Sequence, residues 1–318
     1  MNFVKTKLKY YQNWESLPFG SGAITMRGCW ASIATLVITN PVSAQIVPDN
    51  TLEVNSNVAP GCTACTIEGG TVRGTNLFHS FNEFSVPTGG EAFFNNATSI
   101  QNIFTRVTGN SVSNIDGLIR ANGTANLFLI NPNGIIFNSN ASFNIGGSFI
   151  ASTANSLNFS DGINFSAVNS QNAPLLMINV PIGLQYGSNV GSVEVQGSTL
   201  QVNSGQTLAL AGGNVSINGG KLLASGGRIE LGGVATESTV GLLVNNPSIN
   251  LSFPIGVSRS DVSLTNGAQV NVRDGSGGGG SIAINARNLN ISGASTRGEQ
   301  CGFVRSSKKQ AIAKIKSK

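Results

Sequence analysis

A repeat of 22 residues near the middle of the chain constrains the fold more than any other feature of the sequence. Residues 126–159 read NLFLINPNGIIFNSNASFNIGGSFIASTANSLNF, with apolar residues at alternate positions in four short runs. The apolar positions recur at an offset of 22 in the pairs Leu127 and Phe149, Leu129 and Ala151, Ile135 and Leu157, and Phe137 and Phe159. Alternation with a period of two predicts β-strands, and the longer fixed period predicts that a supersecondary unit stacks on its copy. We therefore expect an all-β chain that forms a right-handed parallel β-helix.

The same register extends along most of the chain. Val107 and Ile115 lie 22 residues before Leu129 and Phe137 and predict one more coil. A spacing of 21 residues separates the apolar pair Leu208 and Leu210 from the pair Ile229 and Leu231. A related module occurs at residues 207–217 (TLALAGGNVSI) and again at 281–291 (SIAINARNLNI). The period predicts about nine to eleven coils, each stabilised mainly by contacts with its neighbours.

Three segments depart from the coil pattern. Residues 46–59 predict a strand that caps the first coil, which would otherwise expose an open edge. Residues 174–187 and 244–262 interrupt the period and predict two excursions, such as hairpins on the flank of the helix. Five phenylalanines in residues 67–94 are expected to pack the first coils rather than to bind a ligand: Phe78, Phe81, Phe84, Phe93 and Phe94.

The tetrapeptide NPNG, Asn131 to Gly134, has the composition of a type I turn, with Pro132 at the second position and Asn133 at the third. Because a proline has no N–H to donate to a sheet, Pro132 is expected at a corner between strands. The tetrapeptide is the candidate functional motif of this chain.

Composition and charge exclude two broad classes of protein. Only 10% of the 318 residues are charged while 40% are hydrophobic, so the chain does not have the makeup of a disordered protein. The formal net charge of +5 arises at the two ends. Residues 28–296 carry 8 basic and 12 acidic groups, a net charge of −4, which gives no basis for nucleic-acid binding.

The amino end predicts export. Residues 30–38 (WASIATLVI) form a short apolar segment, and Val42-Ser43-Ala44 places small residues before a cleavage site, so residues 1–44 are interpreted as a signal peptide. Met26 is an alternative start that would give a compact signal with Arg27 as its basic region. A buried hydrophobic strand is the competing interpretation of the apolar segment.

Cys62 and Cys65 (CTAC) are expected to form a local disulfide, because export places the chain in an oxidising compartment. Free thiols or a metal site are the alternatives, but no second cysteine pair or histidine cluster completes a set of metal ligands. We expect neither a metal nor a cofactor.

Catalysis is not indicated by the titratable residues. A polysaccharide lyase or hydrolase on this fold would need clustered carboxylates, and the acidic residues are scattered without a DxD motif. His79, the only histidine, is expected to be a packed residue. Fold alone does not settle function. A carbohydrate-active enzyme and a stand-alone glycan-binding module therefore stay as alternatives to a non-enzymatic role.

Four segments together carry a family resemblance: 67–86 (IEGGTVRGTNLFHSFNEFSV), 117–137 (GLIRANGTANLFLINPNGIIF), 180–187 (VPIGLQYG) and 281–292 (SIAINARNLNIS). Residues 45–295 closely resemble the filamentous haemagglutinin N-terminal domain, the secretion (TPS) domain of two-partner secretion exoproteins, in a form typical of cyanobacteria. The family's NPNG motif corresponds to the tetrapeptide above. An NPNL-type motif, which the family also carries, is not placed in this sequence.

The resemblance implies both a fold and a role. It implies a pectin-lyase-like parallel β-helix with an amino-terminal cap and extra-helical hairpins. It also implies a haemagglutinin- or adhesin-like exoprotein that passes through the Sec machinery into the periplasm of a Gram-negative cell. There the POTRA domains of an outer-membrane TpsB-type β-barrel transporter of the Omp85 class would recognise the domain and export it to the surface or the medium. Cell-surface glycans or receptors would be further partners.

The carboxyl end departs abruptly from the coil pattern. The repeat stops near Ser295, and residues 296–318 form a basic tail with seven basic groups and one acidic group. A truncated or frameshifted gene is our interpretation, and a genuine basic tail is the alternative. Residues 311–318 weakly predict a short basic helix. The last coil is expected to lack a cap.

Overall fold

The computed structural model describes residues 45–160, 162–170, 179–245, 247–275, 279–293, 301–306 and 310–316. The predicted signal peptide and its alternative start therefore lie outside the described residues. All regular elements in the described ranges are β-strands. No helix in these ranges is long and apolar enough to span a membrane.

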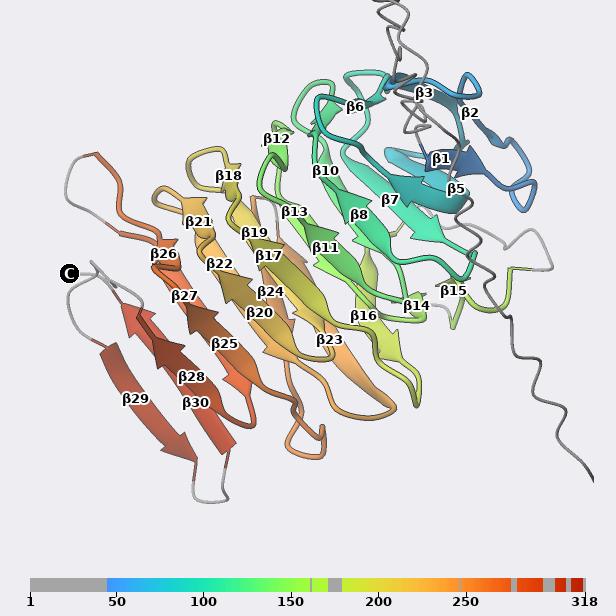
Figure 1. Cartoon of the computed structure of the whole chain (residues 1–318). Helices are drawn as coiled ribbons and strands as arrows, with labels where there is room; N and C mark the ends of the chain where they lie inside the picture. Colours follow the sequence, from blue (N-terminus) through green and yellow to red (C-terminus); the bar gives the residue numbers. More distant parts are fainter. Residues whose placement is uncertain are drawn as a thin grey trace, which may run out of the picture. The chain divides into compact units, whose positions relative to one another are not determined.

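Successive coils stack their strands into sheets around a common interior, as a parallel β-helix does (Figure 1). The long sheet contains, in spatial order, β1 (Gln45–Pro48), β5 (Asn76–Ser85), β7 (Asn102–Val107), β10 (Asn126–Ile130), β13 (Phe149–Ser152), β19 (Thr207–Gly212), β22 (Arg228–Gly233), β27 (Ser281–Ala286), β30 (Gln310–Lys316) and β29 (Cys301–Ser306), with β4 (Thr71–Arg73) also paired to β5. From β5 to β27 its strands are parallel, which accounts for seven coils in the described chain.

Two further faces complete each coil. The six-stranded sheet contains β28 (Leu289–Ser292), β25 (Val262–Thr265), β20 (Val215–Asn218), β17 (Val193–Gln196), β11 (Ile135–Phe137) and β8 (Ser113–Ile115). The third face consists of a five-stranded sheet, β12 (Ser142–Asn144), β9 (Leu118–Ala121), β6 (Glu91–Phe94), β3 (Ala64–Gly69) and β2 (Ser56–Asn57), and a three-stranded sheet, β18 (Thr199–Val202), β21 (Lys221–Ala224) and β26 (Gln269–Asn271). One apolar cluster fills the interior that these faces enclose.

The predicted register is confirmed where the strands belong to consecutive coils. Leu127 pairs with Phe149 and Leu129 with Ala151 on the long sheet. Ile115 pairs with Phe137 on the six-stranded sheet. The spacing of 21 residues is also confirmed, since Leu208 pairs with Ile229 and Leu210 with Leu231. The two related modules occupy equivalent positions in their coils, because β19 and β27 both belong to the long sheet and β20 and β28 to the six-stranded sheet.

Two predicted pairings are wrong. Leu157 does not stack on Ile135, whose partners are Ser113 and Val193. Leu157 and Phe159 instead belong to a sheet outside the helix, because the chain leaves the coil directly after β13. The offset of 22 was a coincidence there: any strand buried on one face alternates with a period of two.

The other wrong pairing concerns Leu129, which pairs with Thr105 and not with Val107. The spacing between β7 and β10 is 24 residues, as Leu127 pairs with Ile103. The spacing between the following strands is 22, so the turn between them absorbs the difference. The stack is also shorter than the nine to eleven coils expected, because the excursions take up more of the chain than their apparent length.

The two excursions combine into one covering sheet of antiparallel strands: β15 (Asn164–Ser166), β14 (Ser156–Phe159), β16 (Pro181–Tyr186), β23 (Ser238–Asn245) and β24 (Ser248–Ser252). The first excursion thus begins well before residue 174, and the second begins at Ser238. The pairing of Leu184 with Val240 joins two segments that the sequence separates widely. Neither excursion is a separate hairpin.

A second apolar cluster lies between the covering sheet and the outer face of the long sheet. Phe78, Phe104 and Phe128 come from successive coils and are fully buried on this outer face. The ring of Phe159, from the covering sheet, lies 6.1 Å from that of Phe78 and 5.7 Å from that of Phe104, between centroids. Several strands of the long sheet are therefore buried on both faces.

Both ends of the long sheet are closed by antiparallel strands. The first end carries β1 and β4, which pair with different parts of β5, in keeping with the predicted cap. At the other end, β30 pairs with β27 and with β29. The expected helix at residues 311–318 is therefore wrong, as is the expected absence of a cap. The open edge of β27 offers unpaired backbone groups, and a strand can satisfy them where a helix cannot.

His79 packs inside the first coils. Its Nδ1 atom lies 2.9 Å from the hydroxyl of Ser56, and its ring stacks on Phe81 with centroids 6.0 Å apart. Burial lowers the pKa of His79 to about 3. The histidine is therefore neutral at physiological pH. Of the phenylalanines expected to pack this region, only Phe93 is partly exposed.

The second apolar cluster predicts a large effect of truncation on the outer face of the long sheet. Phe128→Ala should lower the free energy of unfolding by about 3–5 kcal/mol, because it opens a cavity in a fully buried site. Leu243→Ala is the matched control, since Leu243 is 56% exposed on the covering sheet, and should change stability by less than about 0.5 kcal/mol. Urea denaturation of the purified chain measures both. Equal small effects would contradict a second core.

The buried neutral His79 predicts acid sensitivity. Its pKa is lower in the folded state than the ordinary 6.5, so the unfolded chain binds the extra proton. Stability should be complete above about pH 6.5 and fall as the pH drops toward 3, by roughly 1 kcal/mol per pH unit at most. His79→Asn, which keeps a polar partner for Ser56 but cannot titrate, should flatten this dependence in pH-resolved urea melts. An unchanged slope would mean that other groups dominate.

Candidate functional site

The NPNG tetrapeptide forms the corner between β10 and β11. The backbone N–H of Gly134 donates to the carbonyl of Asn131 at 3.2 Å and closes a four-residue turn. Pro132 occupies the second position, where it has no N–H to satisfy. Gly134 has a φ of 131°, which a side chain would disfavour. The backbone of the corner therefore requires both a proline and a glycine at their observed positions.

The side chain of Asn131 holds this corner from inside. It is fully buried, and its Oδ1 atom accepts a hydrogen bond from the backbone N–H of Asn133 at 3.0 Å. Its Nδ2 atom donates to the carbonyl of Ser111 and to the hydroxyl of Ser113, both at 2.9 Å. Ser111 and Ser113 belong to the preceding coil. Asn131 thus ties the turn to the coil before it, and its amide has no capacity left to contact a partner protein.

The following coil closes on the other side of the corner. The carbonyl of Pro132 accepts a hydrogen bond from the N–H of Gly191 at 3.2 Å, and the N–H of Ile135 donates to the carbonyl of Ser192 at 3.1 Å. A Cβ atom at Gly191 would lie 2.6 Å from the Pro132 carbonyl oxygen, so only glycine allows this approach. Gly191 directly precedes the strand with which the stack resumes after the first excursion.

Only part of the corner faces solvent. Asn133 is exposed, and its Nδ2 atom donates to the carbonyl of Gly109 at 2.8 Å. Pro132 is half-buried, whereas Asn131 and Gly134 are buried. A partner that approached the corner would meet Asn133 and the ring of Pro132, neither of which is charged.

Sequence reasoning found the tetrapeptide but missed its partners. Gly191 and Ser192 lie almost 60 residues further along the chain, because the first excursion intervenes. The doubled contacts of Asn131 with Ser111 and Ser113 were not predicted either. The only signal in the sequence was the resumption of alternation near Val193, which is where the next coil begins.

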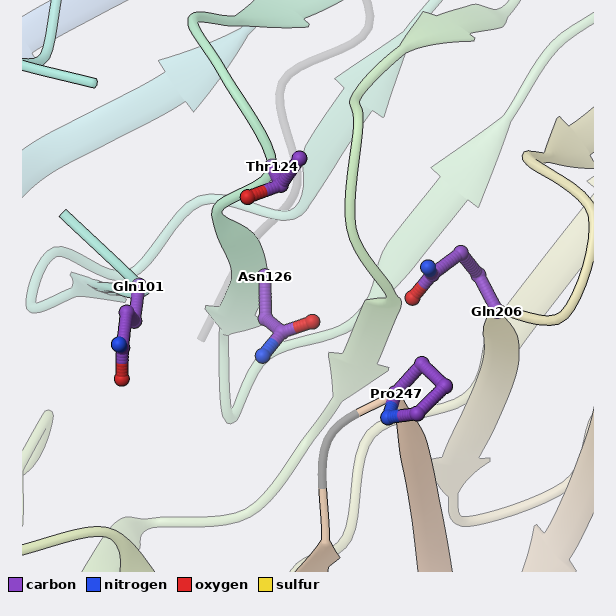
Figure 2. Close-up of a pocket in the computed structure, with 5 residues that line it drawn as sticks. All are labelled: Gln101, Thr124, Asn126, Gln206 and Pro247. Carbon is purple, nitrogen blue, oxygen red and sulfur yellow. The ribbon is translucent and has the colours of Figure 1, made fainter. Parts of the chain in front are cut away.

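A polar hollow of about 320 Å³ lies at a second place, beside the amino ends of the long-sheet strands (Figure 2). It is lined by Gln101, Thr124, Asn126, Gln206 and Pro247. These residues come from separate coils and from the turn between β23 and β24. None of them was singled out from the sequence, because they share no motif.

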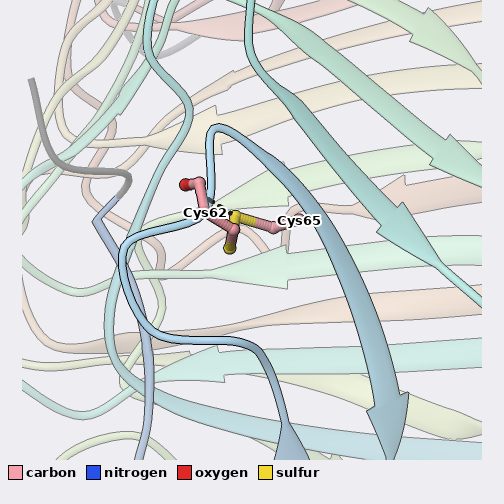
Figure 3. Close-up of a disulfide and its surroundings, with 2 residues drawn as sticks. All are labelled: Cys62 and Cys65. Carbon is pink, nitrogen blue, oxygen red and sulfur yellow. Dashed lines mark hydrogen bonds between the residues drawn. A yellow bond between two sulfur atoms is a disulfide. The ribbon is translucent and has the colours of Figure 1, made fainter.

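Cys62 and Cys65 are joined by a disulfide at the beginning of β3 (Figure 3). Cys65 is buried in the interior cluster and Cys62 packs against the same cluster from a partly exposed position. The bridge closes a small local loop within the amino-terminal cap. It leaves no thiol at these positions for redox chemistry.

The titratable groups do not form a catalytic arrangement in the described residues. No group of three or more potential metal ligands occurs in that part of the chain. A general acid for sugar cleavage needs a raised pKa. Hydrogen bonds from Arg287 instead lower the pKa of Asp261. Burial tends to raise the pKa of Asp116, but hydrogen bonds from Thr88 and Asn140 outweigh it and lower the pKa.

Comparison with known proteins agrees with this architecture. The family model described as the TPS secretion domain matches residues 44–285. The crystal structure of the HMW1 secretion domain from Haemophilus influenzae is similar, with a TM-score of 0.50 and 19% sequence identity. The match covers 75% of this chain and 55% of the HMW1 chain, and at this identity it concerns the fold alone. No curated protein matches the chain.

The family match spans the cap, the stacked coils and the covering sheet, and includes the NPNG corner and the polar hollow. It ends inside β27, at the last coil before the carboxyl-terminal hairpin. The match therefore coincides with the folded unit described above. The chain belongs to the TPS secretion domain family, the secretion domain of two-partner secretion exoproteins.

Proposed function

We propose that this chain is recognised by the POTRA domains of an Omp85-class, TpsB-type outer-membrane transporter and has no enzymatic activity of its own. The observation that carries the proposal is the family match over residues 44–285, which covers the whole β-helix and its covering sheet. The lowered pKa values of Asp116 and Asp261 support the non-enzymatic role.

The route of export follows from the same proposal. The Sec machinery delivers the chain to the periplasm of a Gram-negative, cyanobacterial cell, guided by the signal predicted in residues 1–44. The transporter then releases it to the cell surface or the medium. An adhesin-like role toward cell-surface receptors would belong to the complete exoprotein.

The order of contacts supports folding after translocation. Strands of the first four coils, up to β13, pair with neighbours that are close in sequence, so this part can fold as it emerges. The covering sheet can form only when both β16 and β23 are outside. Loss of the emerged coils back through the pore would require breaking a completed stack. Folding therefore favours outward movement.

The NPNG corner supports a role through shape. Asn131 and Pro132 are engaged by the coils on both sides, which leaves Asn133 as the main exposed side chain. We propose that the corner acts by fixing the turn and the re-entry of the chain near Gly191. Direct contact of Asn133 with the transporter is the alternative.

Co-expression with the cognate outer-membrane transporter tests the main proposal. Protein in the culture medium should depend on the transporter, while the periplasmic level should rise when the transporter is absent. Deletion of its POTRA domains should abolish release as completely as deletion of the whole transporter. A periplasmic reporter that stays inside in all strains controls for lysis. Release without the transporter would contradict the proposal.

A matched pair of variants separates shape from contact at the corner. Asn131→Ala should lower the free energy of unfolding by about 1–3 kcal/mol, because buried partners lose their hydrogen bonds, and should reduce secretion. Asn133→Ala should change stability by less than about 0.5 kcal/mol, because the side chain is exposed, and should leave secretion near the wild-type level. Urea melts and immunoblots of the medium measure the two effects. Loss of secretion in Asn133→Ala with unchanged stability would instead establish direct contact.

A further inference from the structure

The polar hollow beside the long sheet arises from a gap in a column of stacked residues. The strand pairings place Gln101, Ala125, Gly147 and Gln206 one residue before the paired stretches of four successive long-sheet strands. The glutamines at the two ends of this column carry long amide side chains. Ala125 and Gly147 between them have almost no side chain, so the column is open in the middle. The hollow of about 320 Å³ therefore results from the choice of residues at fixed positions of the coils.

The side chains around the gap offer neutral hydrogen-bonding groups. Figure 2 shows Gln101, Thr124 and Asn126 on one side of the hollow and Gln206 and Pro247 on the other. Within the described chain, the Nδ-type amide protons of the two glutamines at Nε2 have no protein acceptor, and neither does the hydroxyl proton of Thr124. None of the five lining residues is charged. The site can thus both donate to and accept from an uncharged polar ligand.

Ser148 fixes one wall of the hollow in place. Its hydroxyl lies 3.2 Å from Oε1 of Gln206 and 3.0 Å from the carbonyl of Pro247, and it accepts a hydrogen bond from the N–H of Thr207 at 2.8 Å. Ser148 is fully buried. The turn between β23 and β24 is thereby held against the coil that carries Gln206. A ligand would meet a wall that is positioned before binding, which lowers the cost of ordering.

We propose that this hollow binds a neutral sugar, as one or two pyranose units of a glycan. Vicinal hydroxyl groups of a sugar match primary amides, which offer a donor and an acceptor side by side. The ring of Pro247 supplies an apolar surface for the C–H face of the sugar. The volume lies at the lower end of the range for small-molecule sites. With few contacts and no aromatic ring in the lining, affinity for a monosaccharide should be in the millimolar range.

The absence of charge in the lining sets the specificity. A carboxylated sugar would lose water from its charge without meeting a cation among the lining residues, which is unfavourable. Neutral hexoses should therefore bind better than uronic acids. This site is distant in sequence from the NPNG corner and does not depend on the secretion role.

Solution NMR of the purified chain with sugar probes tests the proposal. Methyl α-D-glucoside, methyl α-D-galactoside, N-acetyl-D-glucosamine and cellobiose are titrated, with D-glucuronate as the charged control. At least one neutral probe should shift the side-chain amide resonances of Gln101 and Gln206 in a saturable manner. Glucuronate should shift them less. If no neutral probe produces saturable shifts, or if glucuronate binds best, the proposal is wrong.

Variants locate the binding. Gln101→Leu and Gln206→Leu should each weaken binding about fivefold, the loss expected for one hydrogen bond. Gln196→Leu is the matched control, since Gln196 is exposed on β17 in another sheet, and should bind as the wild type does. Thr124→Val gives an independent check from the other side of the hollow. Unchanged affinity in all three lining variants would place the sugar elsewhere and overturn the assignment.

Discussion

Burial of the long sheet on both faces is the constraint on which the rest of this structure depends. The stack of coils fills the inner face by itself, because each strand adds apolar side chains to a common interior. The outer face carries Phe78, Phe104 and Phe128, and burial of each ring contributes roughly 2–3 kcal/mol. Only the covering sheet removes these rings from water. The excursions are therefore part of the core, and a β-helix of this sequence without them would expose a continuous apolar stripe.

One buried cation connects the regions that this arrangement brings together. Arg106, on β7, donates to the hydroxyls of Ser80 and Thr51 and to the carbonyl of Ser166. These groups belong to the first coil, the cap and the covering sheet, respectively. Desolvation lowers the pKa of Arg106 to about 10, and the charge of Asp49 partly opposes this, so the side chain stays protonated at neutral pH. Removal of the guanidinium would leave three segments with unpaired groups, whereas most coil contacts involve immediate neighbours.

The sequence was most informative where the chain is locally repetitive. Leu127 and Phe149 belong to consecutive coils, so their spacing in sequence equals their spacing in structure. The same arithmetic failed for Leu157, because an antiparallel strand in the covering sheet has the same alternation as a coil strand. Periodicity reports that one face is buried, but not which element buries it. The pairing of Leu184 with Val240 could not be predicted, because no local pattern links the two excursions.

The NPNG corner combines both situations. Its turn followed from the conformational preferences of proline, asparagine and glycine, which act locally. Its importance follows from Gly191, which the first excursion places far along the chain. Because the Pro132 carbonyl receives the N–H of Gly191, the corner is the point where the stack resumes after the chain has formed the outer strands. An error in the turn would displace the next coil and, through it, the strands that β17 and β19 begin. A motif can thus be required for secretion without any contact with the transporter, since the shape it fixes lies between the first coils and all later ones.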